Sequence, residues 1–530
     1  MELKLESYRA AREALINADR ALRRDRLPLT TTINSLGPGD LETKADAILR
    51  RIRQEEADTI WTEVHPSIPH PFPGMEFLTG KSIIEKTKIF KILSKMPKGG
   101  LLHAHLDATV NAQVLMKLVE QYPAYHVSVD QVLTEENLYA VLPQFEVFTA
   151  AGHAATSITS DSYSLGSWVP YQDARKNFAF GGADGFDRWV NAALTINPKE
   201  AYETYNTSTK IWEKFSSVFI CARPLVLYEP VFEQYVREFF LSSIADGISY
   251  VEPRFNFYYK TMVGADGSPL EHRQWLLIFD RVLKQVKEEL ESQGRGDEFH
   301  GARVIYTSLR FLSPEEVEWY LEDCLALKKE FPHLIAGFDL VGEENAGRPL
   351  IDFLEVFMKF EARQKEEGVS IPFIFHAGET LGDGTHADCN LYDAILLGTK
   401  RIGHAFSLAK HPEILKICRE KGIAIEVCPI SNEILRLTSS MPAHPLPVVL
   451  NNGVPVALCS DDPAVFGNMG LTYDYYQVFV ASEVNGLRTL GKLARDSLEF
   501  STLDGEEKAA ALRAWERRWD EFVRYIAGLE

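Results

Sequence analysis

Eight short apolar runs, each followed at once by polar or charged residues, recur along the chain from residue 100 onward. They are GLLHAHLD (100–107), ISYVEPRF (248–255), RVIYTSLRF (303–311), IAGFDLVG (335–342), IPFIFHAGE (371–379), RIGHA (401–405), IAIEVCPIS (423–431) and VPVALCSDDP (454–463). Apolar, β-branched runs that alternate with helical segments are typical of a parallel sheet covered on both faces. Eight such units predict an α/β fold, a (β/α)8 TIM-type barrel, with the active site at the carboxyl ends of the strands.

Two segments do not follow this alternation of apolar runs and helical segments. Residues 1–75 carry amphipathic helical patterns at 3–26 and 40–57, so we expect an N-terminal helical extension. Its helices need a partner surface, which is either a second subunit in a homodimer or the body of the same chain. The gap at about 108–245 is far longer than one crossover helix requires, so we expect an insertion after the first barrel strand that forms a lid or small subdomain. Residues 76–530 are the expected barrel domain.

Composition narrows the class of protein. The chain has 530 residues, of which 75 are acidic and 56 are basic, and its formal net charge is −19. This balance argues against general binding to nucleic acid or to an anionic membrane. The six cysteines form no CxxC pair, so no zinc knuckle or disulfide framework is predicted. Because the start has no apolar signal core, we expect a cytoplasmic enzyme, with an extracellular location as the alternative if a signal peptide has been removed.

The polar residues at the strand ends include a set of metal-ligand type. His103 and His105 are two positions apart and therefore point to the same face of a strand. His376 follows the fifth run and Asp461 the eighth. Three imidazoles and a carboxylate suit a zinc-like divalent cation. We predict one zinc ion per subunit, held by His103, His105, His376 and Asp461.

Three further strand-end residues suit other roles. A water nucleophile needs a group that takes or holds its proton, and His404 is placed for this. An acid is needed on the far side of the substrate, which suits Glu379. Asp462 cannot easily share the metal with Asp461, so it is interpreted as a substrate contact. A single strand-end histidine is more often a hydrogen-bonded core residue, but the complete set in this order favours catalysis.

Six motifs resemble those of the adenosine deaminase family of metal-dependent hydrolases: MPKGGLLHAHLD, GFDLVGEE, FHAGET, RIGHA, EVCPISNEIL and SDDPAVFG. The likeness covers roughly residues 75–525 and is closer to the adenosine-deaminase-related growth factor branch. It implies hydrolytic deamination at C6 of an adenine nucleoside, with release of ammonia. It also implies that Glu379 protonates purine N1, that His404 orients or deprotonates the water, that Asp462 contacts N7, and that the backbone of Gly342 contacts N3.

The sugar side departs from that branch. The branch has an aspartate directly after the second histidine, whereas here Leu106 comes first and Asp107 follows, as in other members of the family where this aspartate contacts the ribose. Leu309 stands where the branch has a histidine, while Trp212 resembles its aromatic contact. The branch is commonly secreted and disulfide-stapled in its insertion, yet this chain has no cysteine before Cys221. That departure supports the intracellular expectation.

The sequence therefore predicts an adenine compound as the substrate but does not decide which one. Adenosine is the leading expectation, with 2′-deoxy, 5′-modified and N6-modified adenine nucleosides as alternatives. AMP or free adenine is a second hypothesis; a phosphate would need basic residues, and the nearest candidates are Arg175, Lys176 and Arg188. A non-catalytic signalling or binding homologue is a third, although every predicted ligand and the acid are present.

Overall fold

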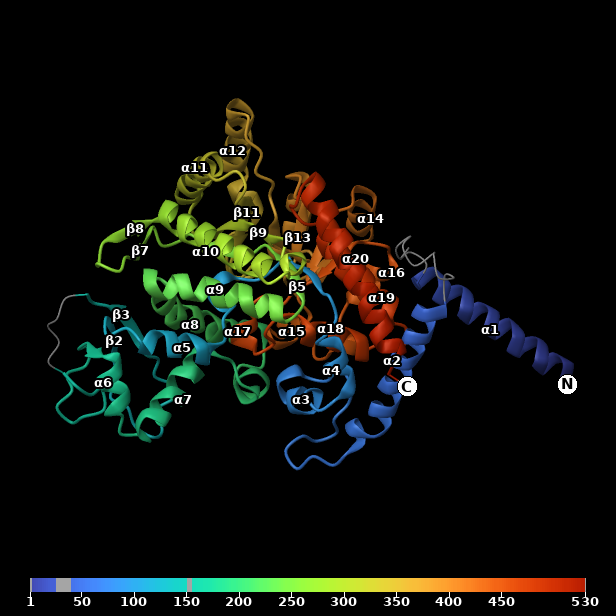
Figure 1. Cartoon of the computed structure of the whole chain (residues 1–530), viewed down its shortest axis with the longest axis horizontal. Helices are drawn as coiled ribbons and strands as arrows, with labels where there is room; N and C mark the ends of the chain where they lie inside the picture. Colours follow the sequence, from blue (N-terminus) through green and yellow to red (C-terminus); the bar gives the residue numbers. More distant parts are fainter. Residues whose placement is uncertain (1, 25–39, 150–154, 530) are drawn as a thin grey trace.

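The computed structural model describes residues 2–24, 40–149 and 155–529. Its central strands are surrounded by helices (Figure 1). Each predicted run contains a strand; the second run is divided into two strands, and a short strand, β9, precedes the third run. The strands are β1 Gly99–Leu101, β5 Ile248–Val251, β6 Arg254–Asn256, β9 Gly301–Ala302, β10 Val304–Leu309, β11 Ile335–Val341, β12 Phe375–Ala377, β13 Arg401–His404, β14 Ala424–Val427 and β15 Val456–Leu458.

These strands close into a barrel. They pair in the orders β1-β5-β9, β11-β10-β6 and β12-β13-β14-β15, and all of these pairings are parallel. A parallel bridge between Phe338 and Phe373 joins β11 to the run that contains β12. A second parallel bridge, between Ala104 and Asp461, joins the first run to the last. The predicted TIM-type barrel is therefore confirmed, and its carboxyl ends share one mouth.

Helices form the outer layer. Those after the second strand run are α10 His272–Ser292, α11 Pro314–Glu330, α12 Leu354–Glu367, α13 His386–Leu396, α14 Pro412–Lys421, α15 Pro429–Ile434, α16 Leu446–Asn451, α17 Pro463–Phe466, α18 Thr472–Val480, α19 Leu487–Glu499 and α20 Gly505–Ala527. Local sequence sets their starts. At α11, the Ser313 side chain accepts a hydrogen bond from the Glu316 backbone N–H, and the Glu316 carboxylate accepts one from the Ser313 backbone N–H. This is a capping box, with Pro314 in the first turn.

The long segment between β1 and β5 forms a lobe beside the barrel, drawn in blue-green to green in Figure 1. It contains α5 Ala112–Glu120, β2 Tyr125–Ser128, β3 Gln144–Val147, β4 Val169–Pro170, α6 Tyr171–Lys176, α7 Gly182–Leu194, α8 Ser208–Val226 and α9 Glu229–Ala245. Its three strands pair antiparallel in the order β3-β2-β4. A hairpin of β7 Thr261–Val263 and β8 Pro269–Glu271 follows β6.

The two N-terminal helices differ in their surroundings. Helix α1 (Glu2–Arg24) projects from the body, whereas α2 (Asp40–Asp58) packs against α20 (Figure 1). Ala45, Leu49 and Ile52 of α2 are buried, while Tyr8 and Leu15 of α1 are 68% and 71% exposed. Packing onto the same chain therefore buries the apolar face of α2, whereas α1 contacts α16 and leaves Tyr8 and Leu15 exposed. The segment between the two helices, residues 25–39, lies outside the described residues. Two short helices, α3 Phe77–Ile84 and α4 Lys88–Leu93, lead into β1.

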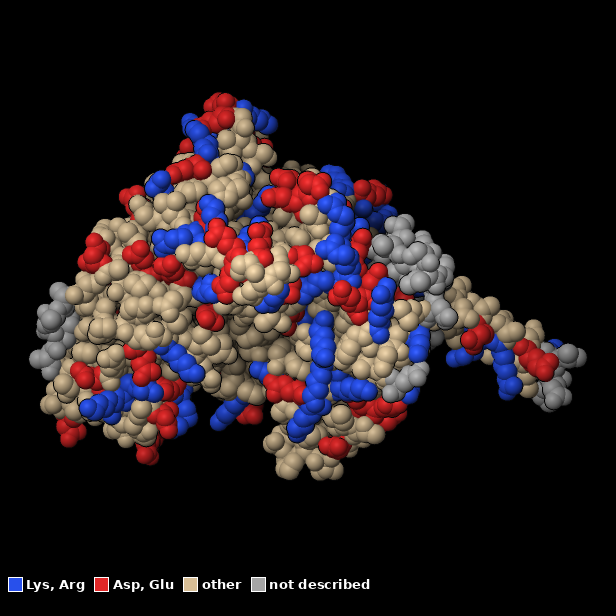
Figure 2. Space-filling view, viewed as in Figure 1, with Lys and Arg blue, Asp and Glu red and all other residues tan. Residues whose placement is uncertain are grey.

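The surface is mixed in charge. Figure 2 shows acidic and basic side chains interspersed over the visible face. Within the described parts of the chain, no helix combines the length and the apolar character that crossing a bilayer requires. The six cysteines, all at described positions, carry free thiols.

Candidate active site

The predicted metal ligands meet at the carboxyl mouth of the barrel. The ligand atoms of His103, His376, His404 and Asp461 all lie within 4.8 Å of one another, and the four side chains are buried. His105 belongs to a second group that shares Asp461. The structure thus brings the predicted set together and places His404 inside the tighter group. Which of the histidines bind a metal stays a prediction at this point.

Asp461 is the centre of this cluster. Its Oδ1 lies 3.2 Å from His103 Nε2 and 3.3 Å from His105 Nε2, and its Oδ2 lies 3.8 Å from His404 Nε2. Ser431 Oγ donates a hydrogen bond of 2.7 Å to Asp461 Oδ2. Burial alone would raise the pKa of Asp461, but the neighbouring imidazoles of His404 and His103 lower it well below its ordinary value. The side chain is therefore an anionic carboxylate at neutral pH.

Two unpaired atoms show that the cluster suits a cation. His103 Nε2 and Asp461 Oδ1 are buried and have no hydrogen-bond partner among the described residues. Buried polar atoms without partners are rare and costly. A divalent cation between them would satisfy both atoms, and imidazole with carboxylate is a donor set that binds zinc. The residues present therefore fit a divalent metal ion.

The backbone is strained where it aims these side chains. His404, Ala405 and Asp461 have φ angles of +59°, +45° and +61°, in the left-handed region that residues other than glycine rarely occupy. Each such residue costs about 1–3 kcal/mol, and strain of this kind clusters at functional sites. The turn at each position directs a polar side chain into the mouth as its strand ends.

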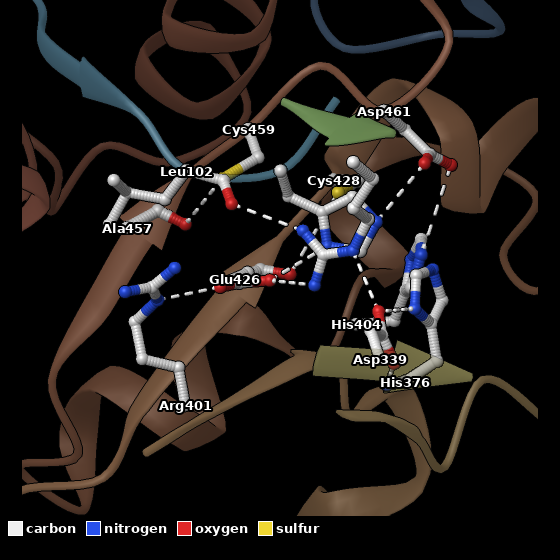
Figure 3. A network of polar contacts seen from close by, with 12 residues as sticks. Leu102, Asp339, His376, Arg401, His404, Glu426, Cys428, Ala457, Cys459 and Asp461 are labelled. Carbon is white, nitrogen blue, oxygen red and sulfur yellow. Dashed lines mark hydrogen bonds and ion pairs between the residues drawn. The ribbon is translucent and has the colours of Figure 1, made fainter. Parts of the chain in front are cut away.

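Buried carboxylates orient two of the histidines (Figure 3). His103 Nδ1 lies 2.8 Å from Glu426 Oε2, and His376 Nδ1 lies 2.6 Å from Asp339 Oδ2. Arg254 bridges the two carboxylates, with Nε 2.8 Å from Asp339 Oδ2 and Nη2 2.7 Å from Glu426 Oε2. Each imidazole therefore donates Nδ1–H to a carboxylate and keeps the lone pair of Nε2 available for a metal.

A second arginine extends this network below the mouth. Arg401 donates to Glu426 Oε1 and to Glu252 Oε2, both at 2.6 Å. No motif in the sequence pointed to a role for Glu252, Arg254, Asp339, Arg401 or Glu426. The signal was present, because each is a charged residue inside an otherwise apolar strand run, where an unpaired charge would be very costly.

Glu379 lies beside the cluster as a neutral acid. Its Oε1 is 3.5 Å from His404 Nδ1, and its backbone N–H donates to Glu344 Oε1 at 2.8 Å. Burial, reinforced by the carboxylates of Asp461 and Glu344, raises the pKa of Glu379 well above its ordinary value. A carboxyl group that keeps its proton at neutral pH suits a general acid.

A cavity of about 490 Å³ opens in front of these groups. This volume lies within the range of about 300–1,000 Å³ that is usual for small-molecule sites. All four predicted substrate contacts line the cavity: Asp107, Trp212, Gly342 and Asp462. Leu309, the departure noted in the sequence, also lines it. The glycine has φ +110°, a conformation that favours glycine over any other residue.

Two arginines that the sequence did not single out, Arg223 and Arg310, line the cavity. Arg223, from α8, lies 3.4 Å from Asp107 Oδ2 and over the ring of Tyr259 at 5.1 Å. By contrast, Arg175 is paired with Asp187 and lines a separate groove on the lobe. Sequence alone could not select Arg223, because its partner Asp107 is 116 positions away along the chain and the fold of the inserted lobe brings the two together.

A closed barrel with a buried histidine–aspartate cluster at its carboxyl mouth has the architecture of a metal-dependent hydrolase. Comparison with known proteins identifies the branch of that class. The sequence profile of the family described as adenosine deaminase matches residues 191–515, and the chain belongs to this family.

Several named relatives are similar over most of the chain. It is 34% identical over 458 residues to adenosine deaminase 2-A of Danio rerio, covering 85% of this chain and 84% of that protein. It is 32% identical to adenosine deaminase 2 of Homo sapiens, covering 86% and 84%. It is 30% identical to adenosine deaminase 2 of Dictyostelium discoideum, covering 98% and 88%.

Solved structures share the fold at low identity. An adenine deaminase from Arthrobacter aurescens is 18% identical with a TM-score of 0.52, covering 80% of this chain and 99% of that chain. The N6-mAMP deaminase of Arabidopsis is 16% identical with a TM-score of 0.53, covering 81% and 99%. At this level of identity the likeness concerns the fold alone.

Proposed function

We propose that the protein is a zinc-dependent aminohydrolase that deaminates adenosine, or a closely related adenine nucleoside, at C6. One observation carries the proposal: a buried metal-ligand cluster and the protonated carboxyl of Glu379 face the same cavity. This pairing provides a nucleophile and a general acid on one substrate. The names of the relatives in the same family support the choice of an adenine nucleoside.

The metal would be held by His103, His105, His376 and Asp461. A zinc ion bound there supplies Lewis acidity, which lowers the pKa of a water ligand toward neutrality. Burial lowers the pKa of His376 well below its ordinary value, with the neighbouring imidazole of His103 acting in the same direction, so His376 is a neutral donor. Glu379 donates its proton to purine N1, which makes C6 more electrophilic.

Asp462 can recognise the other side of the purine. Burial, together with the negative charge of Asp461, raises the pKa of Asp462 well above its ordinary value. The protonated carboxyl is a hydrogen-bond donor, which complements the acceptor N7 of adenine. The backbone of Gly342 is the proposed donor to N3, and Asp107 is the proposed contact to the sugar.

The charges around the cavity favour a nucleoside over a nucleotide. Its acidic lining consists of Asp107, Glu343, Glu379, Asp461 and Asp462. Of its two arginines, Arg223 is paired with Asp107, and Arg310 donates to the backbone carbonyls of Leu340 and His376. Both arginines therefore already have partners within the protein, which disfavours a phosphate at either of them.

A substrate panel tests this proposal. Purified protein with measured zinc content is assayed for ammonia release from adenosine, 2′-deoxyadenosine, N6-methyladenosine, AMP and adenine. We expect the highest kcat/KM with an adenine nucleoside and the lowest with AMP. Rapid turnover of AMP alongside no turnover of any nucleoside would overturn the substrate class.

Glu379→Gln tests the general acid. The amide has nearly the same shape but no acidic proton, so kcat should fall by about 10²–10⁴, the usual contribution of general acid catalysis. Zinc content should stay at one ion per chain. Glu413→Gln, on the exposed side of α14, is the matched control and should keep wild-type turnover. Undiminished activity of the Glu379 variant would refute the assigned role.

We also propose that α1 joins two copies of the chain into a homodimer. Tyr8 and Leu15 on its apolar stripe are 68% and 71% exposed, although α1 also contacts α16 of the same chain. Light scattering after size-exclusion chromatography should give the mass of a dimer for the wild type and of a monomer for Tyr8→Glu/Leu15→Glu. Glu13→Lys, on the opposite side of the helix, should stay dimeric. A monomeric wild type would contradict the proposal.

A further inference from the structure

A line of buried polar groups leads from a backbone amide to His404. The Leu446 N–H donates to His444 Nδ1 at 3.0 Å, and His444 Nε2 lies 3.0 Å from Asn432 Oδ1. Asn432 Nδ2 in turn lies 3.3 Å from His404 Nδ1. His404, Asn432 and His444 are at most 5% exposed. None of these contacts involves a predicted metal ligand.

The backbone amide fixes the direction of every bond in this line. A backbone N–H can only donate, so His444 Nδ1 must be the acceptor. Burial lowers the pKa of His444 to about 3, so the ring is neutral and its single proton is on Nε2. That proton is donated to Asn432 Oδ1, which leaves the amide nitrogen of Asn432 facing His404.

The orientation of Asn432 then determines the tautomer of His404. An amide NH₂ group only donates, so His404 Nδ1 must accept and the proton of its neutral ring is on Nε2. If His404 carried its proton on Nδ1, the side-chain amide of Asn432 would have to flip and turn its oxygen toward His404. Its NH₂ group would then face His444 Nε2, so His444 would have to carry its own proton on Nδ1. That proton would point at the Leu446 N–H, and two donors would face each other. A backbone group therefore excludes the alternative.

The same reasoning separates the histidines of the cluster by role. At His103 and His376 the group facing Nδ1 is a carboxylate, which accepts, so Nε2 keeps its lone pair. At His404 the hydrogen-bond partner of Nδ1 is the Asn432 amide, which donates, while Glu379 Oε1 lies 3.5 Å away and makes no hydrogen bond with it; Nε2 therefore carries the hydrogen. An imidazole nitrogen that carries hydrogen cannot bind a metal, but it can donate to an oxygen.

We propose that Asn432 and His444 are positioning residues that hold His404 as an Nε2–H donor aimed at the attacking water and at Asp461. His404 Nε2 lies 3.8 Å from Asp461 Oδ2, which leaves it directed at the centre of the cluster. His404 then orients the nucleophile by donating to its oxygen and does not act as its base. This inference rests on the proposed deaminase function and distinguishes the two roles left open for His404.

Asn432→Asp reverses one bond of the line with almost no change in shape. The carboxylate still accepts from His444 Nε2, but it presents an acceptor to His404, which must then carry its proton on Nδ1. Loss of the Nε2–H donor should lower kcat by about 10²–10³, the usual effect of removing one preorganised donor. KM and zinc content should stay close to wild type.

Ligand binding distinguishes this role from a merely structural one. Calorimetry compares inosine, a planar product, with a nucleoside analogue whose C6 is tetrahedral and carries a hydroxyl. We expect Asn432→Asp to weaken binding of the tetrahedral analogue by about the factor lost in kcat, since a donor to the transition state is removed. Affinity for inosine should stay the same. Equal losses for both ligands, or wild-type kcat, would overturn the inference.

Two further measurements hold even if Asn432→Asp folds poorly. His444→Gln keeps a donor near the position of His444 Nε2, so this variant should retain most of the activity. If its activity instead falls to that of Asn432→Asp, the direction assigned to these hydrogen bonds is wrong. In wild-type protein labelled with ¹⁵N-histidine, NMR should show the His404 proton on Nε2, assigned by comparison with His404→Asn. A proton on His404 Nδ1 would refute the inference. Because this measurement needs no turnover of a nucleoside, the inference can fail independently of the proposed function.

Discussion

Replacing Arg254 with methionine should weaken metal binding without changing a single predicted ligand. The arginine is fully buried, and its guanidinium donates to Asp339 at 2.8 Å, to Glu426 at 2.7 Å and to the carbonyl of Leu102 at 3.1 Å. Methionine fills much of the same volume but provides none of these bonds. Two buried carboxylates therefore lose their shared counter-charge.

The loss should fall mainly on the His376 side of the cluster. Glu426 keeps a second arginine, because Arg401 donates to its other oxygen at 2.6 Å. Asp339 keeps only the Nδ1 and the backbone N–H of His376. We expect Asp339 to take up a proton in the variant, after which it no longer fixes the tautomer of His376.

The expected magnitudes follow from these contacts. Breaking a buried ion pair on one side costs about 3–5 kcal/mol of stability. Changing the groups that orient a metal ligand lowers metal affinity about 10–100-fold. At about 1.4 kcal/mol for each factor of ten, the metal-binding loss corresponds to roughly 1.4–2.8 kcal/mol.

Competition with a chromophoric zinc chelator measures the affinity, and thermal unfolding of the metal-free protein measures the stability. Arg175→Met is the matched control. It also removes ionic bonds to two acids, Asp187 and Glu120, but at a partly exposed site on the lobe where each pair contributes little. Zinc binding as tight as wild type in Arg254→Met, or an equal loss in Arg175→Met, would refute the reasoning.

Two further predictions concern the cluster and its surroundings. In Gly403→Ala, the new Cβ would lie 2.9 Å from His103 Cε1, so the ring must shift, and chelator competition should show weaker zinc binding in a folded protein; unchanged affinity would contradict this. Burial raises the pKa of Glu433 to about 8, so the folded state binds a proton that the unfolded state has released above the ordinary carboxyl pKa. Stability should therefore decrease as pH rises through that window, by at most about 1.4 kcal/mol per pH unit for one proton. Urea unfolding at pH 5, 6, 7 and 8 should show a weaker dependence in Glu433→Gln, and parallel curves for the two proteins would exclude Glu433 as the source.

The barrel and its cluster could be predicted because the fold itself brings distant residues together. His103, His376 and Asp461 follow different strands, and a closed ring of parallel strands places all strand ends at one mouth. The pattern of apolar runs was therefore sufficient to predict that they meet. It could not rank His105 against His404 within the cluster, because that depends on which group faces each ring nitrogen.

The contacts that could not be predicted involve segments between the strands, whose path in space the apolar pattern does not determine. Asn432 and His444 are separated by a turn and a 3-10 helix, so their contact with His404 is visible only in three dimensions. Arg223 comes from the lobe, and its approach to Asp107 depends on how α8 crosses the mouth. The N-terminal helices have similar patterns, and hydrophobic periodicity does not show which of them finds a partner in its own chain.

The bridge that closes the ring has a consequence for biosynthesis. Asp461 N donates to His103 O at 3.1 Å and His105 N donates to Asp461 O at 3.0 Å, so the barrel is closed between predicted metal ligands. A ribosome releases the first of these residues long before the last. Until Asp461 emerges, the nascent chain has two open strand edges and no complete metal cluster, and exposed edges of this kind invite association with other chains. Closure of the ring therefore waits for Asp461 to emerge, and a chain that ends before this residue would lack both the closing bridge and the complete histidine–aspartate cluster.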